Sequence, residues 1–212
     1  MMQTSVTDRT DSPRVPTGHR LRWRVVDIVV ASVLGVATGL VFLLWNVAYL
    51  GPKTLLEPLL PGVQGLLNGP WLLAGVLGAL IVRKPGAAIF TEVVAAVVSA
   101  LVGNQWGGFL TVEAGLVQGI GVEIVMLLFL YRRFSLPVAM LAGAASGIAC
   151  ACNDLVLWYP GSAAGFAATY LVTSAISGAV LAGLLGWLIT RGLAATGALD
   201  RFGAGREARG RV

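Results

Sequence analysis

Apolar residues occur along the chain in six long runs, separated by short connections that contain charged residues, glycine or proline. Roughly 20 helical residues span a bilayer's hydrocarbon core, which is about 30 Å thick, and most of these runs come close to that length. We therefore predict an all-α membrane protein with six transmembrane helices. The expected helices cover residues 25–50, 62–82, 87–102, 109–131, 137–158 and 166–190.

The composition supports a location in lipid. Hydrophobic residues make up 57% of the chain and charged residues 12%, and the mean hydropathy is +0.83. Soluble domains carry about 25% charged residues. A net charge of +5 would suit nucleic acid, but the basic residues lie beside the apolar runs, as topology signals do, so we expect no nucleic-acid partner.

The basic residues predict the orientation of the helices. A six-helix chain brings nearly all of them to one side, and only Lys53 of the fifteen lysines and arginines falls on the other. The shared side holds Arg9, Arg14, Arg20, Arg22, Arg24, Arg83, Lys84, Arg132, Arg133, Arg191, Arg201, Arg206, Arg209 and Arg211. By the positive-inside rule, both termini are expected to be cytoplasmic.

Composition along the chain predicts three parts. Residues 1–22 have little apolar content and are expected to form a disordered cytoplasmic tail. Residues 23–192 hold the six helices, and residues 193–212 are expected to form a basic cytoplasmic tail. No short apolar segment with a small-residue cleavage site precedes the first run, so we expect no cleaved signal peptide.

Polar residues inside the apolar runs of residues 81–125 are the main candidates for function. A charged side chain near the bilayer centre costs roughly 2.5–3.5 kcal/mol, so Glu92 must face a cavity, a partner or a ligand. No lysine or arginine is predicted at that depth, which argues against an internal ion pair. A hydrogen-bonded carboxyl, a protonated carboxyl and one that meets a bound cation remain, and we favour a ligand role. Glu113 lies near the outer end of its helix, where its carboxylate reaches water.

Gln118 and Glu123 share the fourth run but lie about 140° apart on an ideal helix. One of them is therefore expected to face a site while the other fixes a neighbouring helix. Asp154, near the outer end of the fifth run, is a candidate to line the same outer cavity. Trp45, Trp71, Trp106 and Trp158 lie near the outer boundary, where they form either an aromatic belt or a binding surface for a cationic ligand.

Two further patterns concern packing and chemistry. Ala31, Gly35 and Gly39 lay a stripe of small residues along the first helix, suited to close approach by a helix of another protein or of the same chain. The single histidine, His19, lies in the tail, and no phosphate-binding loop occurs. We therefore expect no catalytic site, no metal site, no cofactor and no enzymatic activity.

Residues 83–108 (RKPGAAIFTEVVAAVVSALVGNQWGG) and 115–125 (GLVQGIGVEIV) resemble the YkoE family. Residues 136–143 (LPVAMLAG) and 177–186 (SGAVLAGLLG) are also similar, and the resemblance runs from about residue 23 to residue 208. Members of this family are substrate-binding S components of energy-coupling-factor (ECF) vitamin transporters.

The resemblance implies the ECF S-component fold in a bacterial plasma membrane, with a six-helix substrate-binding domain at residues 23–192. The substrate would be thiamine or its hydroxymethylpyrimidine moiety, captured from outside. Partners would be a transmembrane coupling (T) subunit, docking on Ala31, Gly35 and Gly39, and two ATPase (A) subunits. The implied substrate-binding residues are Glu92, Asn104, Gln118, Glu123 and Asp154. We add Trp71 to this set because it lies near the expected outer mouth of the site.

The side chains suit this ligand chemistry, since an aminopyrimidine offers an amine and ring acceptors to a carboxylate and an amide. A thiazolium cation would be stabilised by a carboxylate and by aromatic faces. The alternative that the sequence leaves open is a stand-alone secondary carrier for a small amine-bearing heterocycle, with a membrane carboxylate that couples uptake to protons.

Overall fold

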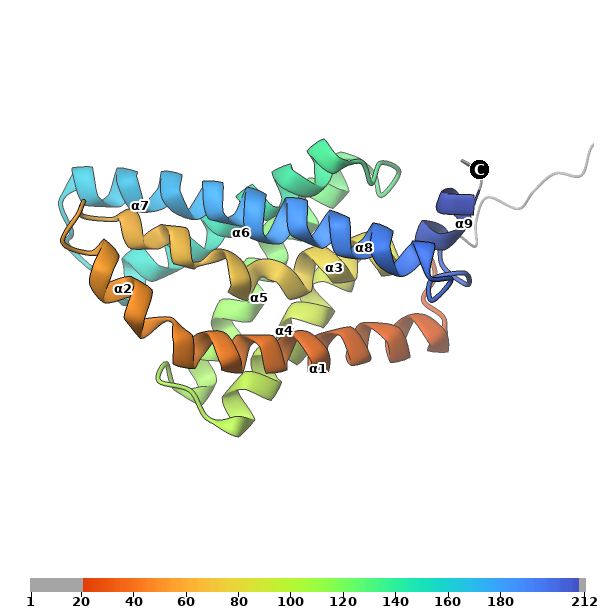
Figure 1. Cartoon of the computed structure of the whole chain (residues 1–212), viewed down its shortest axis with the longest axis horizontal. Helices are drawn as coiled ribbons and strands as arrows, with labels where there is room; N and C mark the ends of the chain where they lie inside the picture. The colour runs from red at the N-terminus through yellow and green to blue at the C-terminus, as the bar shows by residue number, and fades with distance from the viewer. Residues whose placement is uncertain (1–20, 210–212) are drawn as a thin grey trace, which may run out of the picture.

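The computed structural model describes residues 21–209, and these residues form helices joined by turns, without strands (Figure 1). Most of the predicted tail at residues 1–22, with Arg9, Arg14 and Arg20, lies outside the described residues, as does Arg211. The elements are α1 (Val25–Ala48), α2 (Leu50–Leu56), η2 (Val63–Leu67), η3 (Gly69–Leu72), α3 (Leu73–Val82), α4 (Ala87–Val102), α5 (Gly108–Leu128), α6 (Leu136–Leu157), α7 (Ala164–Ser177), η4 (Gly178–Leu184), α8 (Leu185–Ala195) and α9 (Gly203–Arg209).

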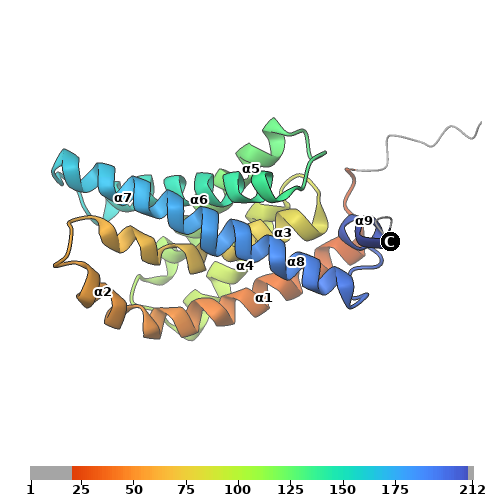
Figure 2. The same cartoon turned by 45° about the horizontal axis from the view of Figure 1, so that its top comes forward.

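Four helices are long and apolar enough to cross a membrane, which confirms an all-helical membrane protein. They are α1, α5, α6 and the continuous rod Ala164–Ala195, in which the π-helical segment η4 joins α7 to α8 (Figure 2). The apolar helices Gly69–Val82 and Ala87–Val102 are shorter. Six crossings, and the cytoplasmic placement of both termini, therefore stay predictions.

The second predicted helix is broken where the sequence reads Asn68-Gly69-Pro70. Two 3₁₀ turns, η2 and η3, precede the short helix α3, whose ten residues are all buried. Irregular backbone at membrane depth is tolerated only where protein covers it. Here α7 provides the cover, because Gly69 N donates to Ser177 Oγ (2.9 Å) and Ser177 Oγ donates to Leu66 O.

The core surrounds α3, which lies between α1 and the α7–η4–α8 rod (Figure 1). A helix that is apolar on all sides is stable only when it is buried on all sides. The helix α6 also packs against this core and contacts η4 through two glycines. A Cβ at Gly143 would lie 2.1 Å from Gly178 O, so this crossing admits no side chain. The core side chains are Leu72, Val76, Leu80, Ala88, Val122, Met126, Val138 and Ala142.

The small-residue stripe of α1 packs inside the chain in this structure. Ala31 is fully buried, and Cβ atoms at Gly35 and Gly39 would lie 2.6 Å and 2.8 Å from the side chains of Val94 and Val98. These valines belong to α4. The intrachain alternative therefore describes this structure, because the short α4 approaches α1 closely enough to cover the whole stripe.

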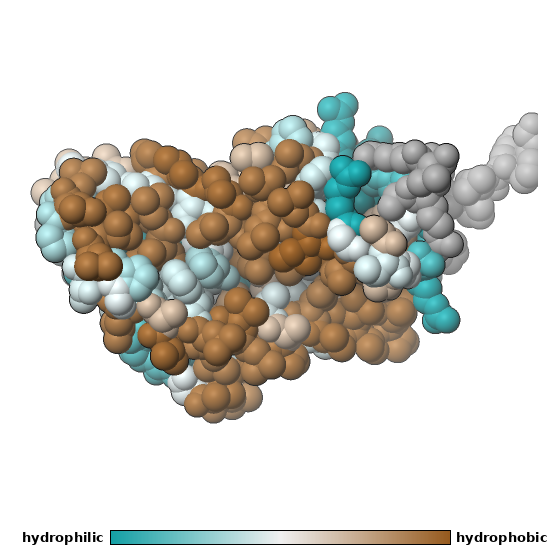
Figure 3. Space-filling model, in the orientation of Figure 1, coloured by the Kyte–Doolittle hydropathy of each residue, from teal (hydrophilic) through white to brown (hydrophobic). Residues whose placement is uncertain are grey.

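The basic segments meet at one end of the molecule. Trp23 Nε1 donates to Pro85 O (2.9 Å), and Arg83 Nη2 lies 2.9 Å from Glu207 Oε2 in α9. Hydrophilic side chains gather mainly at this end, while most of the visible face is apolar (Figure 3). The described part of the predicted basic tail is folded, since Leu199 and Phe202 are buried against the bundle.

Candidate functional site

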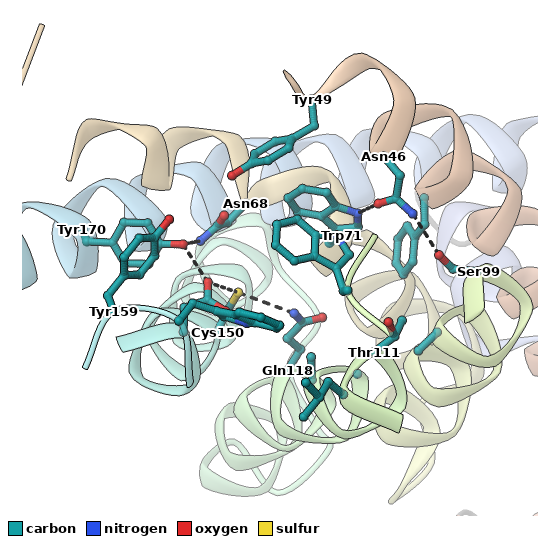
Figure 4. A pocket seen from close by; sticks show the side chains of 18 residues that line it. Asn46, Tyr49, Asn68, Trp71, Ser99, Thr111, Gln118, Cys150, Tyr159 and Tyr170 are labelled. Atoms are coloured by element: carbon teal, nitrogen blue, oxygen red, sulfur yellow. Dashed lines mark hydrogen bonds between the residues drawn. The ribbon is translucent and has the colours of Figure 1, made fainter. Parts of the chain in front are cut away.

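A cavity opens at the other end of the molecule, between the ends of α1, η3, α4, α5, α6 and α7 (Figure 4). Its free space, counted together with its open mouth, is about 760 Å³. Ligand pockets are commonly concave, largely apolar sites with a few placed polar groups. The walls are Phe42, Asn46, Tyr49, Asn68, Trp71, Ala96, Ser99, Trp106, Leu110, Thr111, Ala114, Gly115, Gln118, Cys150, Asp154, Trp158, Tyr159 and Tyr170.

One wall is a chain of aromatic rings. The ring centroids lie 5.0 Å apart for Tyr49 and Trp71, 6.1 Å for Trp71 and Trp106, and 5.6 Å for Trp106 and Trp158, each pair edge to face. Such pairs gain stability beyond their buried area. Three of the four tryptophans near the outer boundary therefore form the cavity wall, while Trp45 Nε1 donates to a backbone oxygen of η2.

The cavity lining also carries a polar network centred on Asp154. Tyr170 OH donates to Asp154 Oδ2 (2.6 Å), and Asn68 Nδ2 donates to Tyr170 OH (3.0 Å). Cys150 Sγ lies 3.6 Å from the same carboxylate oxygen and accepts from Gln118 Nε2 at 3.5 Å. Asp154 is the one carboxylate among the described residues that line the cavity, so it sets the cavity's charge.

A second, smaller network fixes the aromatic wall. Trp71 Nε1 donates to Asn46 Oδ1 (2.8 Å), and Asn46 Nδ2 donates to Ser99 Oγ (3.1 Å). The three side chains come from η3, α1 and α4, and Asn46 and Ser99 are buried. Because the indole N–H and both groups of the Asn46 amide are paired, the Trp71 ring is held in one orientation.

The structure brings three of the six predicted substrate-binding residues to the cavity, namely Trp71, Gln118 and Asp154. Asn104 is not a wall residue but shapes the α4–α5 hairpin that carries Trp106. Its Oδ1 accepts from Trp106 N (2.9 Å) and from Thr111 Oγ1 (3.1 Å). Asn104 therefore acts on the site through the position of Trp106.

Glu92 and Glu123 lie below the cavity and cap helices of the same chain. Glu92 Oε2 accepts from Gly75 N, the third residue of α3. Glu123 Oε1 accepts from Ala88 N (2.8 Å), the second residue of α4, and its Oε2 accepts from Tyr131 OH. The first N–H groups of a helix have no partner within it, and a carboxylate there also meets the positive end of the helix dipole.

The two carboxylates thus satisfy polar groups that the short helices α3 and α4 leave unpaired in the interior. In this structure their partners are backbone N–H groups and the Tyr131 hydroxyl, and neither carboxylate is a wall residue of the cavity. Gln118 and Glu123 face different neighbours, α6 and α4, as their angular separation on one helix predicts.

Sequence reasoning missed Asn46, Asn68 and Tyr170. Each is an uncharged polar group inside an apolar run, and such a position is the signal that singled out the carboxylates. Asn68 also begins the Asn-Gly-Pro break, which marks irregular backbone. These residues could have been found by giving uncharged polar side chains the same weight as charged ones, since unpaired amides in lipid are also costly.

Comparisons with known proteins bear on the function. A family described as "ABC-type cobalt transport system, permease component" matches residues 26–149. A Bacillus subtilis (strain 168) protein named "Putative HMP/thiamine permease protein YkoE" is 39% identical over 186 residues, 87% of this chain and 92% of its own. An S-component of an ECF transporter, solved by crystallography, matches with a TM-score of 0.75 and 34% identity over 90% of this chain and 95% of its own.

Fold, cavity and comparisons together define a multi-pass transport protein of the bacterial plasma membrane, a substrate-binding subunit of the ECF type. The chain belongs to the YkoE family, within the permease components of ABC-type cobalt transport systems. The relatives are transport proteins rather than enzymes. Within residues 21–209, no group of three or more His, Cys, Asp or Glu side chains gathers where it could hold a metal ion.

Proposed function

We propose that this chain captures hydroxymethylpyrimidine or thiamine in the aromatic cavity and delivers it through a transmembrane coupling subunit driven by two ATPase subunits. The observation that carries the proposal is Asp154, the one carboxylate among the described lining residues, in a cavity that a chain of aromatic rings also lines. The similarity to a protein named for hydroxymethylpyrimidine and thiamine supports this choice of substrate.

Each part of the cavity matches a part of these ligands. Asp154 Oδ2 is occupied by Tyr170, whereas Oδ1 has no hydrogen bond to the described residues, so it is available to an amine. The amide of Gln118 offers a further acceptor and donor to the pyrimidine ring. The indole faces of Trp71, Trp106 and Trp158 suit a flat aromatic ring and, for thiamine, a thiazolium cation.

Glu92, Glu123 and Asn104 take supporting roles in this proposal. Glu92 holds the start of α3, one turn after Trp71, and Asn104 holds the hairpin that presents Trp106. Glu123 holds the start of α4. A binding site is defined only as well as the groups that position its walls, so these residues act on affinity through the geometry of the cavity.

The cavity opens away from the arginine-rich end, which the positive-inside rule places in the cytoplasm. Substrate would therefore enter from outside. The coupling subunit would dock on a lipid-facing surface other than the buried stripe of α1, because Ala31, Gly35 and Gly39 are covered by α4.

Binding of hydroxymethylpyrimidine and of thiamine to the purified protein, followed by tryptophan fluorescence, tests the proposal. We expect saturable quenching without ATP, since three of the six tryptophans line the cavity. Trp45→Phe serves as the control, because Trp45 is not a wall residue and its loss should leave the quenching in place. Absence of saturable binding for both compounds would refute the proposed substrates while leaving the family assignment intact.

A stand-alone proton-coupled carrier is the second candidate, and one observation favours it. Glu92 is fully buried, and its Oε1 has no hydrogen-bond partner among the described residues. Such an oxygen could hold a transferable proton. Uptake in cells separates the candidates: the proposed importer stops when its ATPase subunits are deleted, whereas a proton-coupled carrier stops when the proton gradient is collapsed and survives without any ATPase.

A further inference from the structure

A basic groove lies at the end opposite the cavity, between the α3–α4 turn, the α5–α6 turn and α9. Its charged side chains are Arg83, Arg132, Arg133, Arg206 and Glu207, so cations outnumber carboxylates by four to one in the described lining. These turns join apolar helices, and the groove therefore lies where the protein leaves the bilayer.

The groove gathers four arginines, and two of them have no ion pair with the described residues. Arg83 pairs with Glu207 and lies 4.4 Å over the ring of Phe134. Arg132 and Arg133 are exposed and form no ion pair with the described residues. Charges of one sign held this close repel one another, so an anion that joins them is stabilised.

The backbone that presents these arginines is held in a disfavoured conformation. In the described chain, the non-glycine residues with positive φ are Arg83 (58°), Leu130 (53°) and Tyr131 (52°), and all three lie in the two turns that border the groove. Strained backbone persists where the surroundings over-determine it, commonly at ligand sites. Here the Tyr131 hydroxyl is fixed on Glu123.

Exposed apolar residues directly precede the arginine pair. Leu127, Leu128 and Leu130 are 60%, 75% and 61% exposed at the end of α5. A chain segment with exposed leucines followed at once by Arg132 and Arg133 suits an amphiphile with an anionic head. Basic pockets between transmembrane helices bind phospholipid headgroups, and guanidinium groups bind phosphate through paired hydrogen bonds.

We propose that this groove binds the phosphate-bearing headgroup of an anionic phospholipid, with the acyl chains against the exposed leucines of α5. A free phosphate ion shares the headgroup chemistry but makes no use of the leucines. The site is separate from the substrate cavity, and the proposal does not depend on which substrate the cavity takes.

The test compares lipid binding to the full chain in detergent by native mass spectrometry. The probes are dioleoylphosphatidylglycerol, dioleoylphosphatidylcholine and inorganic phosphate. The double variant Arg132→Gln/Arg133→Gln should bind phosphatidylglycerol about 30-fold more weakly. Each of the two arginines is expected to contribute about half of this loss in binding free energy. The control Arg22→Gln/Arg201→Gln removes the same charge from exposed positions at the same end and should change binding less than about twofold. Glu207→Gln, which removes the groove's carboxylate, should tighten binding.

Preference for phosphatidylglycerol over phosphatidylcholine, lost in the groove variant and kept in the control, is the result that we expect. Equal losses in both double variants would show that overall charge attracts the lipid, and would overturn the groove as a site. If millimolar inorganic phosphate displaces the lipid, the lipid proposal is overturned, and a soluble anion is the ligand of the groove. Equal binding of both lipids would overturn the proposal and leave the arginines as a contact for an acidic partner protein.

Discussion

Replacing Asp154 by asparagine gives the sharpest test of the proposed substrate site. The change preserves the shape of the side chain but removes its charge. Tyr170 OH donates to Asp154 Oδ2 at 2.6 Å, so the amide oxygen of the variant would take that position. The amide NH₂ would then occupy the position of Oδ1, and an acceptor of the cavity becomes a donor.

The magnitude follows from this exchange. A hydrogen bond to a charged group contributes about 1.5–3 kcal/mol. Asp154→Asn should therefore raise the Kd about tenfold to a hundredfold. If the carboxylate accepts the amine of the aminopyrimidine, hydroxymethylpyrimidine and thiamine should lose affinity to the same extent. If it instead pairs with the thiazolium cation, thiamine alone should lose affinity.

The assay is fluorescence titration of both compounds against the wild type, Asp154→Asn and Glu113→Gln. Glu113→Gln is the matched control, because it removes one carboxylate from the adjoining helix α5. Among the described residues Glu113 accepts from Asn153 (3.0 Å), and it is not a wall residue. Its variant should change Kd less than about twofold, as expected of a partly exposed charge. Unchanged affinity of Asp154→Asn for both compounds, with normal thermal unfolding, would refute the assignment of Asp154.

Three further predictions concern the walls and the packing. Glu123→Ala leaves the first turn of α4 without its buried acceptor and should lower the free energy of unfolding by about 2–5 kcal/mol, measured by thermal unfolding in detergent. Gly39→Val would drive a side chain into Val98, and should lower stability by about 1–3 kcal/mol and weaken substrate binding as α1 separates from α4. Trp71→Phe loses the donor to Asn46 and should weaken substrate binding about twofold to tenfold.

Matched variants keep these three predictions interpretable. Glu113→Ala should leave the unfolding temperature nearly unchanged, and a loss equal to that of Glu123→Ala would contradict the capping role. Gly51→Val adds a side chain where a Cβ meets no atom within 4 Å, so it should be tolerated. Trp158→Phe keeps an aromatic ring in the wall, and an effect as large as that of Trp71→Phe would show that the hydrogen bond to Asn46 is unimportant.

The sequence predicted the four long apolar helices because lipid allows few other structures for runs of that length. It did not predict the break in the second run, since hydropathy averages over Asn68 and Pro70 although both disfavour a continuous helix. Protein on all sides, rather than lipid, makes the 3₁₀ turns there stable.

The candidate site was predicted in part. The cost of a buried carboxylate correctly indicated that Glu92 and Glu123 need partners, but spacing along one helix does not reveal which neighbour supplies them. That depends on how helices cross. Asp154 and Trp71 were placed near the outer end by their position in the runs, and they do line the cavity. Their joint arrangement with Asn68 and Tyr170, from distant parts of the chain, is a property of the fold.

The broken second segment also has a consequence for biosynthesis. Its irregular backbone is paired by residues more than a hundred positions later, with Gly69 N bonded to Ser177 and Gly62 O bonded to Thr173. During translation, η2 and η3 are synthesised well before α7. During insertion those polar groups must therefore keep water or other partners, because bare backbone in lipid is costly. The cavity consequently lacks its α7 wall residue, Tyr170, until α7 joins the helices that precede it in the chain.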